Sequence, residues 1–336
     1  MMKKTLCLCF ALAVLMLYCF AGCATPPAAA SEAETSADAT TAAATTTAAA
    51  TTTAAATTTA AATTVAAANF NYNSEITVVS REDGSGTRGA FIELFGIQVK
   101  GEDGSTKDMT TKEAIIADKT DIMMTNIGND PYAIGYISMG SVNSDIKALS
   151  IDGIEATTDA VKNGSYKIQR PFIIATKGAP SGISQDFINF VLSEAGQQVV
   201  IANNYIAIDE SANAYVPDAA VAATSDKLVI AGSSSVTPLM EKLREAYLAV
   251  NASAVIEIHM TDSSAGMAST IDGTCDIGMS SRELKDSESA ELDGVCIALD
   301  GIAVITNNNN PVAGLTAEAV RGIFTGEITN WSEVGQ

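Results

Sequence analysis

The chain has 336 residues, of which 39 are Asp or Glu and 19 are Lys or Arg, so its formal net charge is −20 at neutral pH. A protein this acidic has no general affinity for nucleic acids, and we expect no nucleic-acid partner. An anion site would have to be built locally, from helix ends and one or two arginines. The single histidine and six cysteines have no spacing typical of metal ligands, so neither a metal nor another cofactor is expected.

Residues 1–22 have the layout of a secretory signal peptide. Two lysines precede an apolar run that is shorter than the roughly 20 residues needed to span a membrane, which argues against the alternative of a permanent membrane helix. The segment Phe20-Ala21-Gly22-Cys23 resembles the bacterial lipobox, in which the cysteine is acylated and becomes the new N-terminus. Phe20 stands where Leu is usual. We predict an extracytoplasmic lipoprotein that is anchored to the cell membrane through Cys23.

Residues 23–68 are nearly all alanine and threonine, with the unit Ala-Ala-Ala-Thr-Thr-Thr repeated several times. A segment with almost no large apolar side chain cannot bury a core. We predict a disordered tether that spans on the order of 40 Å and lifts a globular domain off the membrane. The remaining residues, 69–336, are numerous enough for two packed lobes.

Beyond residue 68, strand-like and helix-like runs alternate, and this pattern is typical of an α/β fold. Strands are predicted at residues 76–80, 172–177, 228–231, 255–260, 275–279, 295–298 and 302–306. Helices are predicted from apolar periodicity at residues 88–95, 183–193, 238–250, 266–271 and 316–324. Residues 207–227, rich in Ala, Asp and Ser, are predicted to be an internal linker.

Three loops repeat one design, in which a β-rich run breaks into Gly and Ser and then begins a helix: residues 81–87, 232–238 and 261–266. The first N–H groups of a helix have no intrahelical partner, and the aligned dipoles amount to roughly half a positive charge there. Each loop alone is typical of simple helix capping, but the three together predict an oxyanion-binding protein.

Hydroxyl groups, glycines and one arginine are the candidate contacts in these loops. Arg81 can donate two parallel N–H bonds, and Gly84 and Gly86 allow close backbone approach. The Val236 N–H is a candidate donor, and Thr237 is also a candidate helix cap. The candidates are Arg81, Ser85, Gly86, Thr87, Ser235, Val236, Thr237 and Ser263, with Ser264 as the alternative to Ser263.

Signs of catalysis are few. His259 lies in an apolar run and is interpreted as structural, and Ser85 has no evident pair of a base and a residue that orients it. We expect a binding protein, not an enzyme. Trp331 is interpreted as a packing aromatic. Cys275 and Cys296 could form one disulfide or remain two free thiols.

Several segments resemble the phosphate-binding proteins of bacterial ABC-type phosphate importers. The matching segments are residues 80–88, 232–238, 276–282, 300–304 and 323–331, and residues 133–136 and 170–172 are similar to two further landmarks. The resemblance covers nearly all of residues 76–336. It implies a type II periplasmic-binding fold, in which two α/β lobes on a hinge close over inorganic phosphate. It also implies ligand contacts for the candidates above and adds Ser281.

The order of the matching segments differs from that of the family, because the segment with Arg81 comes first here. The simplest explanation is circular permutation, with the old ends joined through residues 207–227; a truncated tandem array is the alternative. Lobe A would be residues 171–300, and lobe B would combine residues 69–170 with 301–336. The hinge would then lie near residues 170–174 and 300–305.

The resemblance implies capture of phosphate for the permease subunits of an ABC importer. Many family members have an Asp at the position of Ser281, whose carboxylate accepts the ligand's proton and so rejects sulfate; Asp83 or Asp262 could take this role here. One alternative is a sensory or surface protein that binds sulfate, molybdate or a phosphonate. Another is a phosphohydrolase, for which neither a metal set nor an activated nucleophile is visible.

Overall fold

The computed structural model describes residues 70–101, 105–222 and 225–334. The predicted signal peptide, Cys23 and the Ala/Thr tether lie outside these ranges. None of the helices within them is both long enough and apolar enough to cross a membrane.

The first part of the described chain alternates short strands with helices. Its elements are β1 (Thr77–Arg81), α2 (Gly86–Leu94), β2 (Gln98–Lys100), β3 (Thr106–Asp108), β4 (Ile115–Ala117), α3 (Thr120–Asn129), β5 (Ala133–Ser138), β6 (Ile146–Ala148), β7 (Ser150–Ile151) and α4 (Thr158–Lys162). Only β1 and α2 were predicted in this region. The short strands β2 to β4 are largely exposed, so they lack the buried apolar alternation that identifies a strand.

The second part has longer and more apolar elements, most of which the sequence predicted. They are β8 (Gln169–Thr176), α5 (Gly182–Leu192), α6 (Glu194–Ala202), α7 (Ala219–Ala222), β9 (Lys227–Ser233), α8 (Thr237–Val250), β10 (Val255–Thr261), α9 (Ser263–Ile271), β11 (Ile277–Ser280), α10 (Asp286–Ser289), β12 (Asp293–Asn307), β13 (Gly314–Leu315) and α11 (Ala317–Thr325). Helix α8 illustrates why these elements were predictable, since Leu239, Leu243 and Tyr247 recur at helical spacing and are fully buried.

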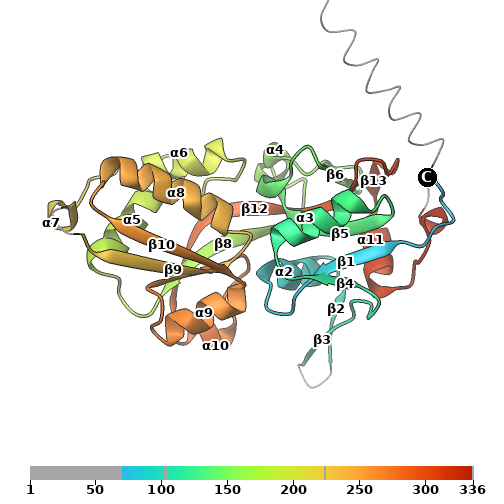
Figure 1. Cartoon of the computed structure of the whole chain (residues 1–336), viewed down its shortest axis with the longest axis horizontal. Coiled ribbons are helices and arrows are strands. Elements are labelled where there is room, and N and C mark those ends of the chain that lie inside the picture. Colours follow the sequence, from blue (N-terminus) through green and yellow to red (C-terminus); the bar gives the residue numbers. More distant parts are fainter. Residues whose placement is uncertain (1–69, 102–104, 223–224, 335–336) are drawn as a thin grey trace, which may run out of the picture. The chain divides into compact units, whose positions relative to one another are not determined.

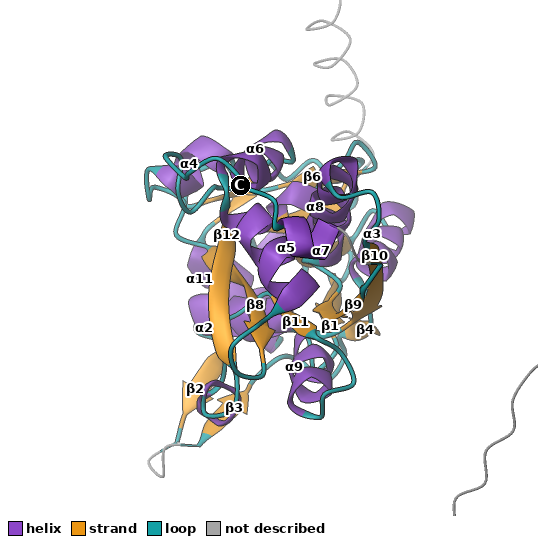
Figure 2. Cartoon of the chain, turned by 90° about the vertical axis from the view of Figure 1, so that its left-hand side faces the viewer, coloured by secondary structure: helices purple, strands orange, loops and turns teal. Residues whose placement is uncertain are grey.

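One sheet of nine strands runs through the described residues, in the order β10-β9-β11-β8-β12-β5-β1-β4, with β6 beside β12. The strands pair in parallel toward both ends of this order, and in the middle β8 and β12 pair antiparallel with each other. Figures 1 and 2 show α5 and α8 on one side of β9 to β11 and α9 on the other. This mixed α/β architecture confirms the predicted fold class.

Strand β12 corrects the sequence prediction of two separate strands at residues 295–298 and 302–306. It is a single strand of 15 residues, with a bulge between Cys296 and Ala298. Asp300-Gly301 separates the two apolar runs, which the sequence prediction assigned to separate strands. Asp300 is instead fully buried and ion-paired, and it therefore continues the strand.

Two large hydrophobic cores lie at the two ends of this sheet. One core draws its residues from positions 70–168 and 302–334, together with Ile206. The other draws them from positions 172–298. We call the two parts lobe B and lobe A, respectively. The boundaries at residues 170 and 300 remain a proposal, which the separation of the cores supports.

The predicted internal linker contains few regular elements, namely α7 and the first residue of β9. It nevertheless packs against lobe A. The Tyr215 hydroxyl and the Asp218 N–H both donate to the Asp186 carboxylate on α5, at 2.6 and 3.0 Å.

A buried ion pair joins the two strands that connect the lobes. The Arg170 guanidinium on β8 donates to Asp300 Oδ2 on β12 at 3.1 and 2.9 Å, and both side chains are almost fully buried. Ser138 donates to the other carboxylate oxygen at 2.9 Å. Burial raises the pKa of Asp300 because desolvation disfavours its charged form. The contacts with Arg170 and Ser138 therefore offset a large free-energy cost of burying the carboxylate.

Asp300→Asn should lower the free energy of unfolding by about 3–5 kcal/mol, because it leaves the Arg170 charge buried without its partner. Chemical denaturation measures the change. Glu327→Gln, in the exposed pair with Arg321, is the matched control and should cost less than about 1 kcal/mol. Equal effects of the two substitutions would contradict the role assigned to the buried pair.

Candidate functional site

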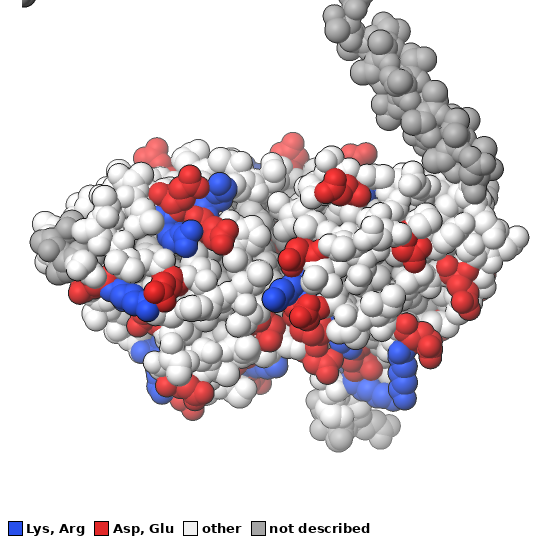
Figure 3. Space-filling view, in the orientation of Figure 1, with Lys and Arg blue, Asp and Glu red and all other residues white. Residues whose placement is uncertain are grey.

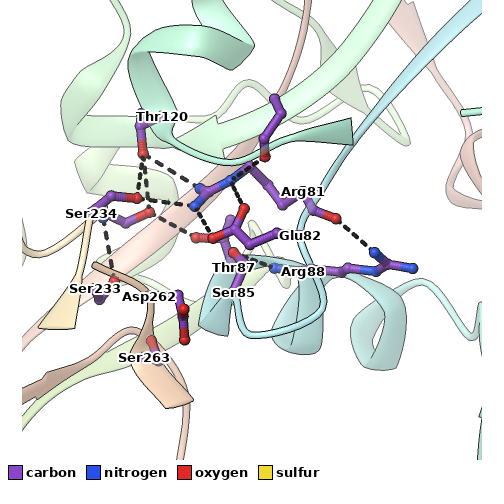
Figure 4. Close-up of polar contacts among 12 residues, drawn as sticks. Arg81, Glu82, Ser85, Thr87, Arg88, Thr120, Ser233, Ser234, Asp262 and Ser263 are labelled. Atoms are coloured by element: carbon purple, nitrogen blue, oxygen red, sulfur yellow. Dashed lines mark hydrogen bonds and ion pairs between the residues drawn. The ribbon is translucent and has the colours of Figure 1, made fainter. Parts of the chain in front are cut away.

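Four strands end at the candidate site. Strand β1 ends at Arg81, β9 ends at Ser233, β10 ends at Thr261 and β11 ends at Ser280. Strands β9, β10 and β11 run parallel, so their carboxyl ends lie at the same edge of the sheet. The loops that follow β1 in lobe B and β9 and β10 in lobe A each lead into a helix, and they meet between the lobes (Figure 4).

The first loop begins helix α2 two residues earlier than predicted. Ser85 is the N-cap, and its Oγ accepts the Arg88 N–H at 3.3 Å, so its own proton is left for another acceptor. Gly86 and Thr87 are therefore the first two helical residues, whose N–H groups have no intrahelical partner. Ser85, Gly86 and Thr87 are all buried.

In the second loop, two candidate donors already have partners within the loop itself. The Val236 N–H was a candidate ligand donor, but it donates to the Ser233 carbonyl at 3.1 Å, and its side chain is buried in the core of lobe A. Thr237 was a candidate cap, but the N-cap of α8 is Val236, and Thr237 Oγ1 donates to the same carbonyl at 3.0 Å. Both donors are thus engaged within a tight turn. Ser234 and Ser235 face the other lobe instead.

Ser263 and Ser281 lie against each other in lobe A. Ser263 begins helix α9, and its Oγ accepts the Ser281 N–H at 3.1 Å. Ser233 donates to Ser281 Oγ at 2.9 Å. The N-cap of α9 is Asp262, whose carboxylate accepts the Ala265 N–H at 2.8 Å. The hydroxyls of three segments therefore form one buried cluster.

Direct hydrogen bonds join the loops of the two lobes. Thr87 Oγ1 and Ser235 Oγ lie 2.7 Å apart, and Arg81 Nη2 donates to Ser234 Oγ at 3.0 Å. The backbone takes part as well, since the Ser264 N–H donates to the Gly84 carbonyl at 3.2 Å. Residues separated by about half of the chain are thus brought together, as the sequence predicted.

Two glycines make this close approach possible. A Cβ atom at Gly86 would lie 2.4 Å from Ser263 Oγ and 2.7 Å from Ser281 Oγ. A Cβ atom at Gly84 would lie 2.4 Å from Asp262 Oδ1. A side chain at either position would therefore require Ser263, Ser281 or Asp262 to move, or the loops of the two lobes to lie farther apart.

The Arg81 guanidinium is almost fully buried and is surrounded by acceptors. Glu82 accepts from Nε at 2.8 Å and from Nη2 at 2.7 Å, and the Ala117 carbonyl accepts from Nε at 3.2 Å. Thr120 Oγ1 lies 3.5 Å from Nη1. Glu82 and Thr120 were not among the predicted site residues. Glu82 could have been found from its position beside Arg81, whereas nothing local distinguishes Thr120.

Other arginines around the loops are also paired with carboxylates. Arg88 pairs with Asp108 and donates to the Arg81 carbonyl at 2.7 Å, and Arg282 pairs with Glu288. Burial alone would raise the pKa of Asp108, but hydrogen bonds from Thr110 and the charge of Arg88 lower it. On the face shown in Figure 3, basic side chains likewise lie next to acidic ones. No large excess of positive charge is visible on this face.

The structure places four other predicted residues outside the site. His259 is 58% exposed on the edge strand β10, 3.6 Å from Glu257, so its interpretation as a packed structural side chain is wrong. Trp331 is fully buried, as predicted. Cys275 and Cys296 are free thiols. In the described part of the chain, no group of three or more His, Cys, Asp or Glu side chains could hold a metal ion.

Comparison with known proteins identifies the family. The model of the PBP superfamily domain matches residues 59–195 and 217–336. Phosphate-binding protein PstS 2 of Streptococcus agalactiae is 51% identical over 263 residues, which cover 78% of this chain and 88% of that protein. Phosphate-binding protein PstS 2 of Streptococcus pneumoniae is 44% identical over 260 residues, covering 77% and 87%.

A solved structure resembles the whole described domain. The crystal structure of the phosphate-binding protein of a phosphate ABC transporter from Streptococcus pneumoniae has a TM-score of 0.62 and 42% identity, and the match covers 78% of this chain and 100% of that one. The predicted circular permutation is untested by these matches and stays a prediction. The chain belongs to the PBP superfamily and, within it, to the PstS-like phosphate-binding proteins.

Proposed function

We propose that the chain is an extracytoplasmic receptor that captures inorganic phosphate between its lobes for an ABC importer, without hydrolysing a phosphate ester. One observation carries the proposal: buried hydroxyls and helix starts from both lobes meet in one cluster, through the Thr87–Ser235 and Arg81–Ser234 contacts. The relatives named above, which are called phosphate-binding proteins, support it.

The ligand's charge would be balanced mainly by dipoles. Arg81 already faces Glu82, so the pair contributes little net charge. The starts of helices α2, α8 and α9 each supply roughly half a positive charge, and the hydroxyls supply short hydrogen bonds. The Thr87 and Ser235 hydroxyls, which here bond to each other, would instead bond to phosphate oxygens. The proposed contacts are Arg81, Ser85, Gly86, Thr87, Ser235, Ser263 and Ser281, together with Val236 and Thr237, whose donors would first have to leave the Ser233 carbonyl.

Ligand entry requires the lobes to separate. The site is buried, and its walls come from both lobes. The lobes are connected through β8 and β12, which pair along their length. Bending at these two strands would open the site in a hinge motion. The permease subunits would then receive phosphate from the reopened receptor.

Thr87→Val should weaken phosphate binding by at least about tenfold, because a buried hydroxyl that donates to a charged ligand is worth about 1.5–3 kcal/mol. Isothermal titration calorimetry with inorganic phosphate measures it, with one phosphate per chain expected for the unmodified protein. Thr274→Val, at an exposed loop position, is the control and should not change the affinity. The absence of phosphate binding by the unmodified protein would overturn the proposal.

Gly86→Ala should weaken phosphate binding by about tenfold or more, because the added methyl group collides with Ser263 and Ser281 when the lobes approach. Gly89→Ala is the matched control on the same helix: its methyl group meets only Arg282 Cδ, at an ordinary 3.5 Å. The same calorimetric titration compares the two variants. Equal affinities would mean that close approach at Gly86 is not needed for binding.

Cys23→Ser should move the protein from the membrane fraction to the soluble fraction of the cells that express it, because the proposed anchor is a lipid on this cysteine. Fractionation followed by immunoblotting measures the distribution. Cys275→Ser, a buried thiol in lobe A, is the control and should leave the protein with the membrane. Membrane retention of the Cys23 variant would contradict the lipid anchor.

A further inference from the structure

The side chain of Arg282 in lobe A lies against helix α2 of lobe B. Arg282 directly follows Ser281, and its side chain is only 12% exposed. A Cβ atom at Gly86 would lie 3.1 Å from Arg282 Cγ, and one at Gly89 would lie 3.5 Å from Arg282 Cδ. The two glycines are three residues apart, so they share one face of α2. The aliphatic stem of Arg282 therefore lies over a part of this helix that has no side chains.

The guanidinium at the end of this stem is held within lobe A. Nη1 and Nη2 donate to the two carboxylate oxygens of Glu288, at 2.7 and 2.8 Å, and Nη2 also donates to Ser264 Oγ at 3.2 Å. Glu288 is 9% exposed and accepts the Lys285 N–H at 2.8 Å. Burial alone would raise the pKa of Glu288, but its contacts with Arg282 and Lys285 lower it, so the carboxylate stays ionised.

The backbone of Arg282 is fixed by the same lobe. The buried Ser280 hydroxyl donates to the Arg282 carbonyl at 2.8 Å, and its oxygen accepts the Arg282 N–H at 3.3 Å. Both ends of the side chain are thus held by lobe A, and the stem between them contacts lobe B. An arginine whose charge is paired in this way has little charge left for an anion, whereas its methylene groups can cover apolar surface.

We propose that Arg282 is a positioning residue, which holds helix α2 against lobe A and so sets how long phosphate stays bound; this inference rests on the proposed phosphate-binding function. Gly86 is a proposed ligand contact, and the Ser263 and Ser281 hydroxyls lie beside it. The stem and α2 bury each other's apolar surface only while the lobes are together. Their contact therefore favours the closed arrangement, and it must be lost before phosphate can leave.

The packing of the stem and the charge of the guanidinium would affect binding differently. If the stem acts by packing, its removal speeds the dissociation of phosphate and leaves association unchanged. If the guanidinium acts by attracting the anion, its removal slows association, and added salt weakens this effect. The Glu288 contact favours packing, because the carboxylate compensates the guanidinium charge.

Two double variants of the full-length protein differ only in the stem. Arg282→Met with Glu288→Gln removes both charges and keeps an unbranched apolar side chain, whereas Arg282→Ala with Glu288→Gln removes the stem as well. Neither variant leaves a buried charge without its partner, as a single neutral substitution would. Arg321→Ala with Glu327→Gln, in an exposed ion pair, is the control and should leave binding unchanged.

The dissociation rate is measured by rapid filtration of the protein loaded with radiolabelled phosphate, after excess unlabelled phosphate is added. We expect the alanine variant to release phosphate at least about tenfold faster than the methionine variant, because each buried methylene group changes an equilibrium constant about fourfold. Arg282→Lys keeps both the stem and a positive charge beside Glu288. It should release phosphate within about threefold of the unmodified rate, and it provides a second measurement if a double variant does not fold.

The outcomes separate this inference from the proposed function. Equal release rates for the alanine and methionine variants would overturn the inference. A difference confined to association, and removed by salt, would overturn it as well, because it would assign the effect to charge. Failure of the unmodified protein to bind phosphate overturns the proposed function, whereas the two preceding results overturn only the role of Arg282.

Discussion

The site depends on the contact of small polar residues across two lobes. Thr87 and Ser235 touch through their hydroxyls at 2.7 Å, and Gly84 and Gly86 leave no side chain to keep the loops apart. Such an approach is favourable only when each buried hydroxyl has a partner, because an unpaired buried polar group costs free energy. Here the hydroxyls satisfy one another. A tetrahedral oxyanion would satisfy several of them at once.

The carboxylates in and around the site are as important as the arginines. The chain as a whole is strongly acidic, yet Arg81, Arg88 and Arg282 each have a carboxylate partner close by. Arg81 alone would present a full positive charge to the ligand. The Glu82 contact removes most of that charge, so binding must come from short hydrogen bonds and helix dipoles. Such interactions depend on the relative positions of the loops of the two lobes, which β8 and β12 must preserve.

Most of the elements that the sequence predicted have apolar residues buried in a regular pattern. Helix α8 follows from the spacing of Leu239, Leu243 and Tyr247, and β9 from its apolar run. The exposed strands β2 to β4 could not be predicted, because pairing with neighbours and not burial defines them. Strand β12 was divided wrongly, because the ion pair that buries Asp300 involves Arg170, which is distant in sequence.

The candidate site was predicted from local loop chemistry, and its details depend on tertiary contacts. The loops with Thr87, Ser235 and Ser263 do meet. The Val236 N–H is engaged by the Ser233 carbonyl, and local sequence does not reveal which amide a tight turn will use. The contact between Arg81 and Ser234 was also not predicted, because these two residues are distant in sequence and meet only through the tertiary structure.

A crystal structure of the protein grown with inorganic phosphate tests the central claim most directly. The account predicts one phosphate between the lobes, contacted by the start of helix α2 at Gly86 and Thr87 and by Ser235 and Ser263 from the opposite lobe. Phosphate bound by one lobe alone, or bound away from these loops, would contradict it.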